Sequence, residues 1–436
     1  MRLLKYIVKS ISQQFFYSAG KIIGLITGIL LHLFRKQTID IMFFKSSNIG
    51  EFFPDIVFFK KYVNQKYLIN KNNGIIYIYK EKEISNLHLD NALKNILLEF
   101  RVLDNLEIIS KNYNSSVLNG IKKGLNSIKE IFNSSSYMLL PYSWHNFIIR
   151  KEILSVTDNI KLEELELEVH LKSLKVDYDF SVDDKYVVLL VNNDLYKMQK
   201  SIGGFYNYNH PKSNYGSLRE TGTDRLEASL NFLINQNYKV LILGRSISGF
   251  DFKSLNKKVI DLSNKIGKSI PDFFDFYLCK HSKIALTTGT GADTILRYYG
   301  IKHLKINHYS YNYISNLSDC IILPTIFLNK ETRLKASWSE IATIQNKFGI
   351  QYNRYFWDQL GIKFMLPDSH DILEATKELV LIDKFGLKGQ KNQSNLLWYN
   401  KAMELDKYRM NIENPKTDFV MISSNFLTQN KHWLLY

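Results

Sequence analysis

The chain has 436 residues, more than one ordinary hydrophobic core requires, so we expect two domains. Hydrophobic residues make up 45% of it, with 27 Tyr and 27 Phe, which excludes an intrinsically disordered protein. Two cysteines, Cys279 and Cys320, are too few for a disulfide framework and fit a reducing compartment.

The net charge of +15 is unevenly distributed. Residues 1–37 carry six basic side chains and no acidic one, whereas the remaining excess is scattered lysine. No zinc-ligand spacing, recognition-helix pattern or aromatic RNA-binding signature accompanies that lysine. We therefore expect no nucleic-acid partner.

The basic N-terminal residues flank a short apolar run. Residues 22–34 lean apolar over thirteen positions, fewer than the roughly 20 that span a bilayer. A cleavable signal is disfavoured, because RKQTID follows instead of small residues. We expect residues 1–37 to lie on the inner membrane surface, in a chain peripherally associated with the cytoplasmic face. A spanning helix extended by residues 15–20 and a plain buried helix are the alternatives.

Strand and helix patterns alternate from residue 38 onward. Strands are predicted over 39–47, 74–81 and 106–111, and helices over 54–63, 91–103 and 117–132. These elements predict an α/β domain over residues 38–180.

An acidic, unpatterned stretch follows at residues 175–184, and we interpret it as the linker. Asp177 and Asp179 form a D-x-D pair, a pattern that binds a divalent metal in some nucleotide-sugar enzymes. Two aspartates at this spacing are common in solvated connections, so we expect no metal site here.

A second α/β series occupies residues 181–365. Its predicted strands are 185–193, 239–245, 257–263, 283–287 and 303–308, with helices over 223–238 and 270–281 between them. Strands that alternate with helices predict a parallel, doubly wound sheet. Residues 366–436 are expected to form a helical tail that packs back on the domains, with Asp368 or Ser369 capping its first helix.

The stretch SKIALTTGTGADTILRYYG, residues 282–300, predicts a strand, a glycine turn and a helix. Glycines at a helix start expose N–H groups and partial positive charge to an anion. We assign donor binding to five residues of this turn: Thr288, Gly289, Thr290, Gly291 and Asp293. The alternative is a glycine-permitted turn in which Asp293 caps the helix.

Two further predicted strands end in polar or glycine-containing pairs, Asn192-Asn193 and Gly244-Arg245. Ligands of parallel sheets bind beyond the carboxyl ends of the strands. The convergence of three such strand ends favours a binding site, with Gly244 and Arg245 as donor-binding residues. A surface ion pair is the alternative role of Arg245.

Three segments carry a family resemblance: YKVLILGRS, IPDFFDFYLCKHSKIALTTGTGAD and ILPTIFLNKETRLKASWSEI. Residues 185–345, and more loosely 38–436, resemble an uncharacterised family of bacterial glycosyltransferases found with surface-polysaccharide genes. That family has Tyr-Arg-Asn-Ser before the first helix of this half, and here LRETG retains only Arg219. Glu51 stands where its Ile-Gly-His turn has histidine.

The resemblance implies a GT-B-like architecture of two Rossmann-like domains, in which the second binds a nucleotide-sugar donor. The first would present a glycan or lipid-linked acceptor of surface-polysaccharide synthesis. Arg219 joins the donor-binding residues, and Glu51 or His210 would be the catalytic base. No cofactor or metal is expected. A non-catalytic scaffold of polysaccharide assembly and a nucleotide-sugar 2-epimerase-like enzyme are the competing interpretations.

Overall fold

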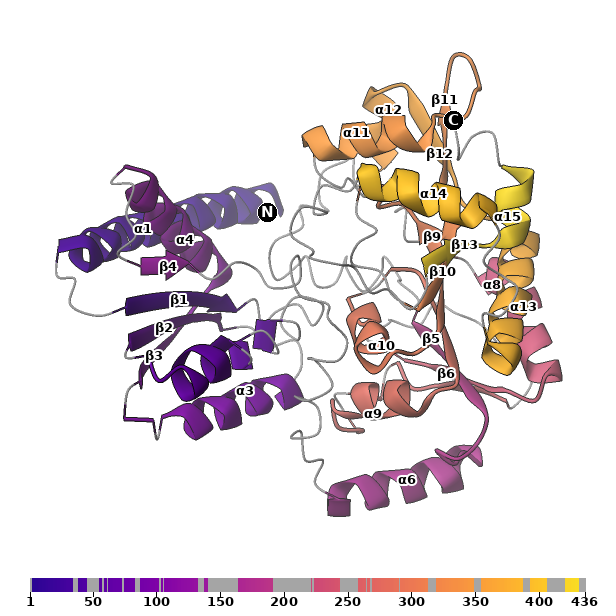
Figure 1. Cartoon of the computed structure of the whole chain (residues 1–436), viewed down its shortest axis with the longest axis horizontal. Helices are drawn as coiled ribbons and strands as arrows, with labels where there is room; N and C mark the ends of the chain where they lie inside the picture. The colour runs from indigo at the N-terminus through magenta and orange to yellow at the C-terminus, as the bar shows by residue number, and fades with distance from the viewer. Residues whose placement is uncertain are drawn as a thin grey trace. The chain divides into compact units, whose positions relative to one another are not determined.

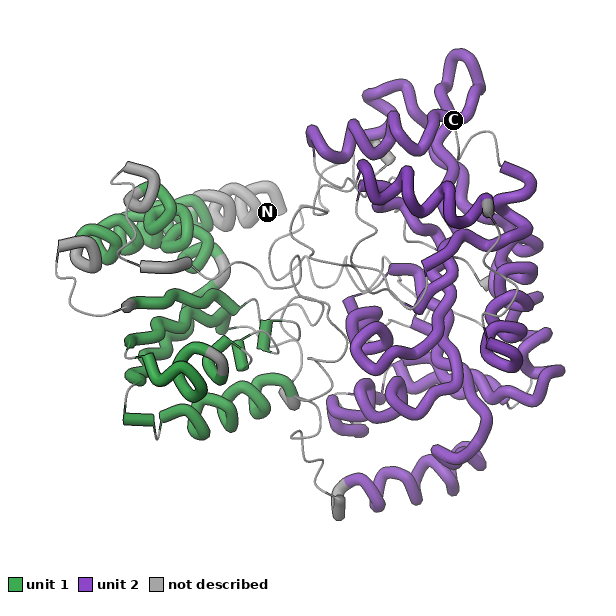
Figure 2. Tube along the Cα trace, viewed as in Figure 1, with its two compact units in different colours: residues 1–147, 155–160 green, residues 148–154, 161–436 purple. Residues whose placement is uncertain are grey.

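The chain forms two compact units, residues 1–147 with 155–160 and residues 148–154 with 161–436 (Figure 2). We describe each unit by itself, from a computed structural model. The residues that it describes are 2–33, 38–44, 55–56, 59–60, 62–72, 74–82, 87–101, 103–104, 106–131, 137–139, 164–190, 221, 223–243, 258–263, 265–266, 269–289, 291–312, 319–348, 354–386, 393–405 and 420–430.

Unit 1 is built on a four-stranded parallel sheet in the order β3-β2-β1-β4. The predicted strands and helices of this half are confirmed where the structure describes them. Its strands are β1 (Thr38–Phe44), β2 (Gly74–Glu81), β3 (Leu106–Tyr113) and β4 (Tyr137–Leu139). Its helices are α1 (Arg2–Leu33), the π-helix η1 (Asn64–Ile69), α3 (Leu87–Phe100) and α4 (Ser115–Ile131).

Strand β1 carries a fully buried carboxylate, Asp40. The hydroxyls of Tyr62 and Tyr67 donate to it at 2.8 and 2.6 Å, and the Lys66 ammonium donates at 2.8 Å. Burial, together with this carboxylate, raises the pKa of both tyrosines. A buried charge is tolerated where it is paired and hydrogen-bonded in this way. The network attaches the π-helix, and the helical residue Tyr62 just before it, to the sheet.

Helices α1 and α4 run in the same direction and pack backbone against backbone (Figure 1). Gly20 and Gly24 of α1 lie against α4, and Gly120 and Gly124 of α4 lie against α1. A Cβ atom at any of the four would overlap main-chain atoms of the other helix. Each pair has the Gly-x-x-x-Gly spacing that places both glycines on one helix face.

The glycine contact joins the basic N-terminal segment to the core of unit 1. The other side of α4 buries Leu118, Ile121 and Leu125 against β1 and β2, so α1 forms an outer layer. None of the described helices is long and apolar enough to cross a membrane. Residues 2–33 are thus one helix that packs on α4 along one side.

Unit 2 contains a seven-stranded, wholly parallel sheet in the order β13-β10-β9-β8-β5-β6-β7. The predicted parallel sheet of this half is confirmed. Its strands are β5 (Tyr186–Leu190), β6 (Lys239–Ile242), β7 (Val259–Asp261), β8 (Ile284–Thr287), β9 (His303–His308), β10 (Cys320–Pro324) and β13 (Val420–Ile422). An antiparallel pair, β11 (Ile326–Asn329) and β12 (Ile362–Met365), is separate from it.

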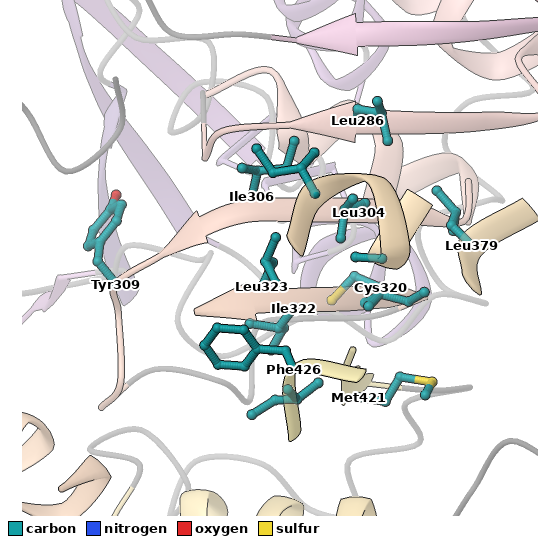
Figure 3. Packing of buried hydrophobic residues seen from close by; sticks show 14 of the residues in the cluster. Leu286, Leu304, Ile306, Tyr309, Cys320, Ile322, Leu323, Leu379, Met421 and Phe426 are labelled. Atoms are coloured by element: carbon teal, nitrogen blue, oxygen red, sulfur yellow. The ribbon is translucent and has the colours of Figure 1, made fainter. Parts of the chain in front are cut away.

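Helices cover both faces of this sheet. Figure 1 shows α8 (Thr223–Asn235) and α13 (Ser369–Phe385) together on one side and α9 (Phe274–His281) and α10 (Asp293–Tyr299) on the other. The core between the sheet and α13 includes Leu286, Leu304 and Ile322 from three neighbouring strands (Figure 3). The other helices of unit 2 are α6 (Glu164–Tyr178), α11 (Trp338–Phe348), α12 (Arg354–Gln359), α14 (Gln393–Glu404) and α15 (Ser424–Gln429).

Two sequence interpretations differ from the structure. The stretch read as a linker is helical up to Tyr178, at the end of α6. Asp179 is exposed and pairs with Lys175 at 2.6 Å, one helical turn earlier. Its charge is therefore paired with a lysine of the last turn of α6. The segment 366–436 is more than a helical tail, because β13 pairs with β10 and extends the main sheet. The predicted cap at Asp368 is confirmed, as a capping box with Asp371.

We predict that Gly24→Val separates α1 from α4 and lowers the free energy of unfolding of unit 1 by about 3 kcal/mol. The new side chain has no space against the main chain of Ile121. Urea denaturation and limited proteolysis within α1 measure the effect. Ser18→Val, at an exposed position of the same helix, is the control and should cost less than about 0.5 kcal/mol. Equal stability of both variants would contradict the glycine contact.

Candidate functional site

The strand order of unit 2 creates a switch point between β5 and β8. From β5 the chain proceeds outward to β6 and β7, then returns to β8 on the other side of β5 and continues through β9 and β10. The carboxyl ends of the two strands stay joined there, since the Thr288 N–H donates to the Leu190 carbonyl at 3.1 Å. In open parallel sheets, ligands bind at such a point, beyond the carboxyl ends of the strands.

A buried carboxylate, Asp293, organises the turn that follows β8. The Thr287 hydroxyl donates a short hydrogen bond to it, and the Lys305 ammonium of β9 lies 3.5 Å from its other oxygen. Thr287 and Lys305 are direct neighbours across the β8–β9 pair, so their side chains share one sheet face. The turn, α10 and β9 are thereby fixed to one another.

Gly289 gives this turn its shape. Its φ is +78°, in the left-handed region where glycine is favoured. The Gly289 N–H donates to the Thr287 hydroxyl at 3.2 Å. A Cβ built at Gly289 would lie 3.8 Å from Cε of Lys305 and 3.9 Å from the Tyr309 hydroxyl. The bare face of the glycine therefore adjoins a lysine side chain and a phenol, both able to donate hydrogen bonds to phosphate oxygens.

The described residues add a source of positive charge that the sequence analysis did not name, next to the backbone N–H groups of the turn. Helix α10 has seven residues, its N-cap is Ala292, and no side chain caps it. So short a helix has a weak dipole, and the carboxylate of Asp293 lies within its first turn. The cation next to the turn is Lys305, whose side chain is 17% exposed.

The end of β9 links the site to the segment before α8. Asn307 has φ +56° and donates through its side chain to the Thr221 hydroxyl at 2.7 Å. Both residues are buried. This bond fixes Thr221 close to the end of β9. In the sequence, Thr221 stands two positions after Arg219.

Buried polar atoms continue along the same sheet edge toward β10. Neither ring nitrogen of His308 has a hydrogen-bond partner of good geometry among the described residues, and the same holds for the Thr325 hydroxyl. The Thr325 N–H donates to the His308 carbonyl at 2.9 Å, so the two residues lie side by side at the ends of β10 and β9. Burial lowers the pKa of His308 well below its usual range, so the ring is neutral at pH 7. Such groups are ready to bind a polar ligand or ordered water.

Of the predicted site residues, four lie in the described turn: Thr288, Gly289, Gly291 and Asp293. Thr288 and Asp293 are buried, and the Gly291 carbonyl accepts from the Thr294 hydroxyl at 2.8 Å. Six others lie outside the described residues: Glu51, His210, Arg219, Gly244, Arg245 and Thr290.

Sequence reasoning missed Lys305, Asn307 and His308, although HLKINH was recognised as a strand. The available signal was the alternation of the polar Lys305 and Asn307 with the apolar Leu304 and Ile306. Within the described parts of the chain, no group of three or more His, Cys, Asp or Glu side chains is arranged to hold a metal ion.

Comparisons with known proteins give slight similarities. No protein-family model matches the chain, and no curated protein matches its sequence. Among solved structures, it is similar to a glycosyl transferase family 9 protein from Veillonella parvula, at 8% identity, TM-score 0.39, over 79% of this chain and 97% of that one. The ADP-heptose lps heptosyltransferase II of E. coli gives 9% identity and TM-score 0.39, over 80% of this chain and 100% of that one.

The UDP-GlcNAc 2-epimerase of Methanocaldococcus jannaschii gives 9% identity and TM-score 0.30, over 80% of this chain and 100% of that one. With TM-scores below 0.5, these similarities do not define an activity. The strand order and the side chains at the switch point are the observations from which function is argued.

We predict that Thr287→Val lowers the free energy of unfolding of unit 2 by about 2–4 kcal/mol. The change keeps the shape of the side chain but leaves the buried Asp293 carboxylate and the Gly289 N–H without their hydroxyl. Urea denaturation measures it. Thr376→Val is the matched control, because that buried hydroxyl only donates within α13, to the Ile372 carbonyl, and its loss should cost about 1 kcal/mol. Equal effects would contradict the organising role of Asp293.

Proposed function

We propose that the chain is a glycosyltransferase that uses a nucleotide-activated sugar, and that unit 2 binds the donor at the carboxyl ends of β5, β8 and β9. The observation that carries the proposal is the left-handed glycine turn beside Lys305 at the switch point of a parallel sheet. Sugar transfer, rather than another nucleotide-dependent reaction, is supported by the resemblance of residues 185–345 to a bacterial glycosyltransferase family.

The chemistry assigns a definite part to the cation. In glycosyl transfer the bond between the anomeric carbon and the diphosphate oxygen breaks, and an acceptor oxygen bonds to that carbon. The diphosphate leaves with the bonding electron pair, so its departure is faster where positive charge meets it. Lys305 is held by Asp293 yet partly exposed, which suits it to this role. The Tyr309 hydroxyl would donate to the same phosphate group.

The pairing of Asp293 with Lys305 also compensates the desolvation of the lysine when no donor is bound. A lone partly buried ammonium would lose hydration without compensation. The carboxylate at 3.5 Å compensates it, and the lysine side chain remains 17% exposed. Asp293 is then a positioning residue for the cation, and the same carboxylate is also able to accept a hydrogen bond from a hydroxyl of the donor sugar.

The acceptor half of the reaction rests on sequence. We propose that unit 1 presents a glycan or lipid-linked acceptor and that Glu51 or His210 removes the proton from its hydroxyl. The two differ in pH behaviour, because a histidine base titrates near pH 6.5 and a glutamate near 4.3. The pH profile of transfer by Glu51→Gln and His210→Gln variants distinguishes them.

We predict that isothermal titration with ADP, UDP, GDP and CDP finds at least one nucleoside diphosphate that binds. Lys305→Met should weaken that binding by roughly tenfold or more, as expected for loss of a charged phosphate contact. Lys302→Met is the matched control. That lysine precedes the same strand at its amino end and lies 3.7 Å from Asp383, so its loss should leave affinity unchanged.

The Lys305→Met variant alone leaves the buried Asp293 carboxylate without its cation. The double variant Asp293→Asn/Lys305→Met removes both charges, so it separates misfolding from loss of the phosphate contact. A folded double variant that binds the nucleotide as tightly as the unaltered chain would contradict the assigned site. Binding to none of the four nucleotides by the unaltered chain would overturn the proposed function.

A further inference from the structure

Helix α1 has an exposed apolar face on the side opposite its glycines. Four large side chains on that side are 40–68% exposed: Phe15, Ile22, Ile26 and Ile29. Phe16 and Ile23 are 43% and 40% exposed and lie nearer to the glycines. At 100° per residue, Gly20 and Gly24 lie close to one direction of the helix, and Phe15, Ile22 and Ile26 lie close to the opposite one. Exposed contiguous apolar surface of this extent marks a site of interaction.

The charged residues of helix α1 are all of one sign. Helix α1 contains four basic residues and no acidic one. Its Lys21 is exposed at the edge of the apolar face. On the neighbouring α4, Lys123 is exposed as well. An apolar helix face with an exposed lysine at its edge, and with no acid on the helix, has the composition that binds a membrane whose headgroups are anionic.

We infer that the exposed face of α1 is a membrane-docking surface. The helix would lie parallel to an anionic lipid bilayer, with this face toward the lipid. The glycines decide the orientation. They use one side of α1 for backbone contact with α4, so only the opposite side can enter lipid. This inference does not depend on the proposed function.

The charges also select the bilayer over a second copy of the chain. In a two-fold symmetric dimer the same surface faces itself. Two α1 helices would then bring their exposed Lys21 side chains to the edges of the shared face, with no acidic residue of either helix to compensate them. An anionic headgroup layer instead supplies the opposite charge along the whole helix.

The test is flotation of the full chain with two kinds of vesicle, phosphatidylcholine alone and phosphatidylcholine with about 30% phosphatidylglycerol. We predict binding to the anionic vesicles, little binding to the neutral ones, and weaker binding in about 0.5 M NaCl. The double variant Ile22→Asn/Ile26→Asn should lose at least about tenfold in vesicle affinity. Both side chains are more than half exposed, so its thermal midpoint should remain that of the unaltered chain.

Leu396→Asn/Leu397→Asn is the matched control. It alters two exposed leucines on α14 of unit 2 and should leave vesicle binding intact. Lys21→Glu supplies an independent variant that keeps the apolar face and reverses one charge, and it should weaken binding to anionic vesicles. The inference is overturned if the unaltered chain floats with neither vesicle, or if the isoleucine variant binds like the unaltered chain. A concentration-dependent dimer that the isoleucine variant dissociates, without vesicle binding, would assign the face to a second copy.

Discussion

The candidate site of unit 2 depends on one buried carboxylate. Asp293 accepts from Thr287 at the end of β8 and faces Lys305 on β9. These contacts join a strand end, a glycine turn, a helix start and a neighbouring strand through a single side chain. Without them, the left-handed turn at Gly289 would have no fixed position relative to the cation. The carboxylate thus converts the general feature of a parallel sheet edge into a defined arrangement of the glycine turn and the lysine, at which we propose that a phosphate binds.

Unit 1 obeys a different constraint. One face of its sheet carries apolar side chains, and the apolar side of α4 packs on that face against β1 and β2. The glycines on the other side of α4 then admit α1 to main-chain distance. Gly20 and Gly24 lie on the side of α1 that contacts α4, and the large apolar side chains Phe15, Ile22 and Ile26 lie on the far side. Close backbone packing on one side and exposed apolar side chains on the other are two consequences of one helix sequence.

The sequence revealed the strands well because each is a short buried run of apolar residues bounded by turns. The glycine turn after β8 was also readable, since its residues are local. Lys305 was not, because its importance arises from the pairing of β8 with β9, and register is a tertiary property. The same applies to β13, which joins the sheet some 100 residues after its neighbour β10.

One misreading had a physical cause, and one helix contact was overlooked. Residues 175–178 look like a linker because acidic and aromatic residues interrupt any apolar period, yet they end a helix whose charges are paired locally. The N-terminal run was interpreted from its length, its hydropathy and the charge and composition of its flanks, without regard to its glycines. The Gly-x-x-x-Gly spacings at 20–24 and 120–124 were present in the sequence, and they predict two helices in contact.

The central claim is that a diphosphate binds at the turn after β8. Hydrogen exchange with and without a nucleoside diphosphate tests it most directly, because backbone amides report where the ligand lies. The account predicts slower exchange over residues 284–300 and 303–309 on addition of the nucleotide, with no change in β1 and β2 of unit 1. Unchanged exchange in those two segments at saturating nucleotide, or slowing confined to other parts of the chain, would contradict it.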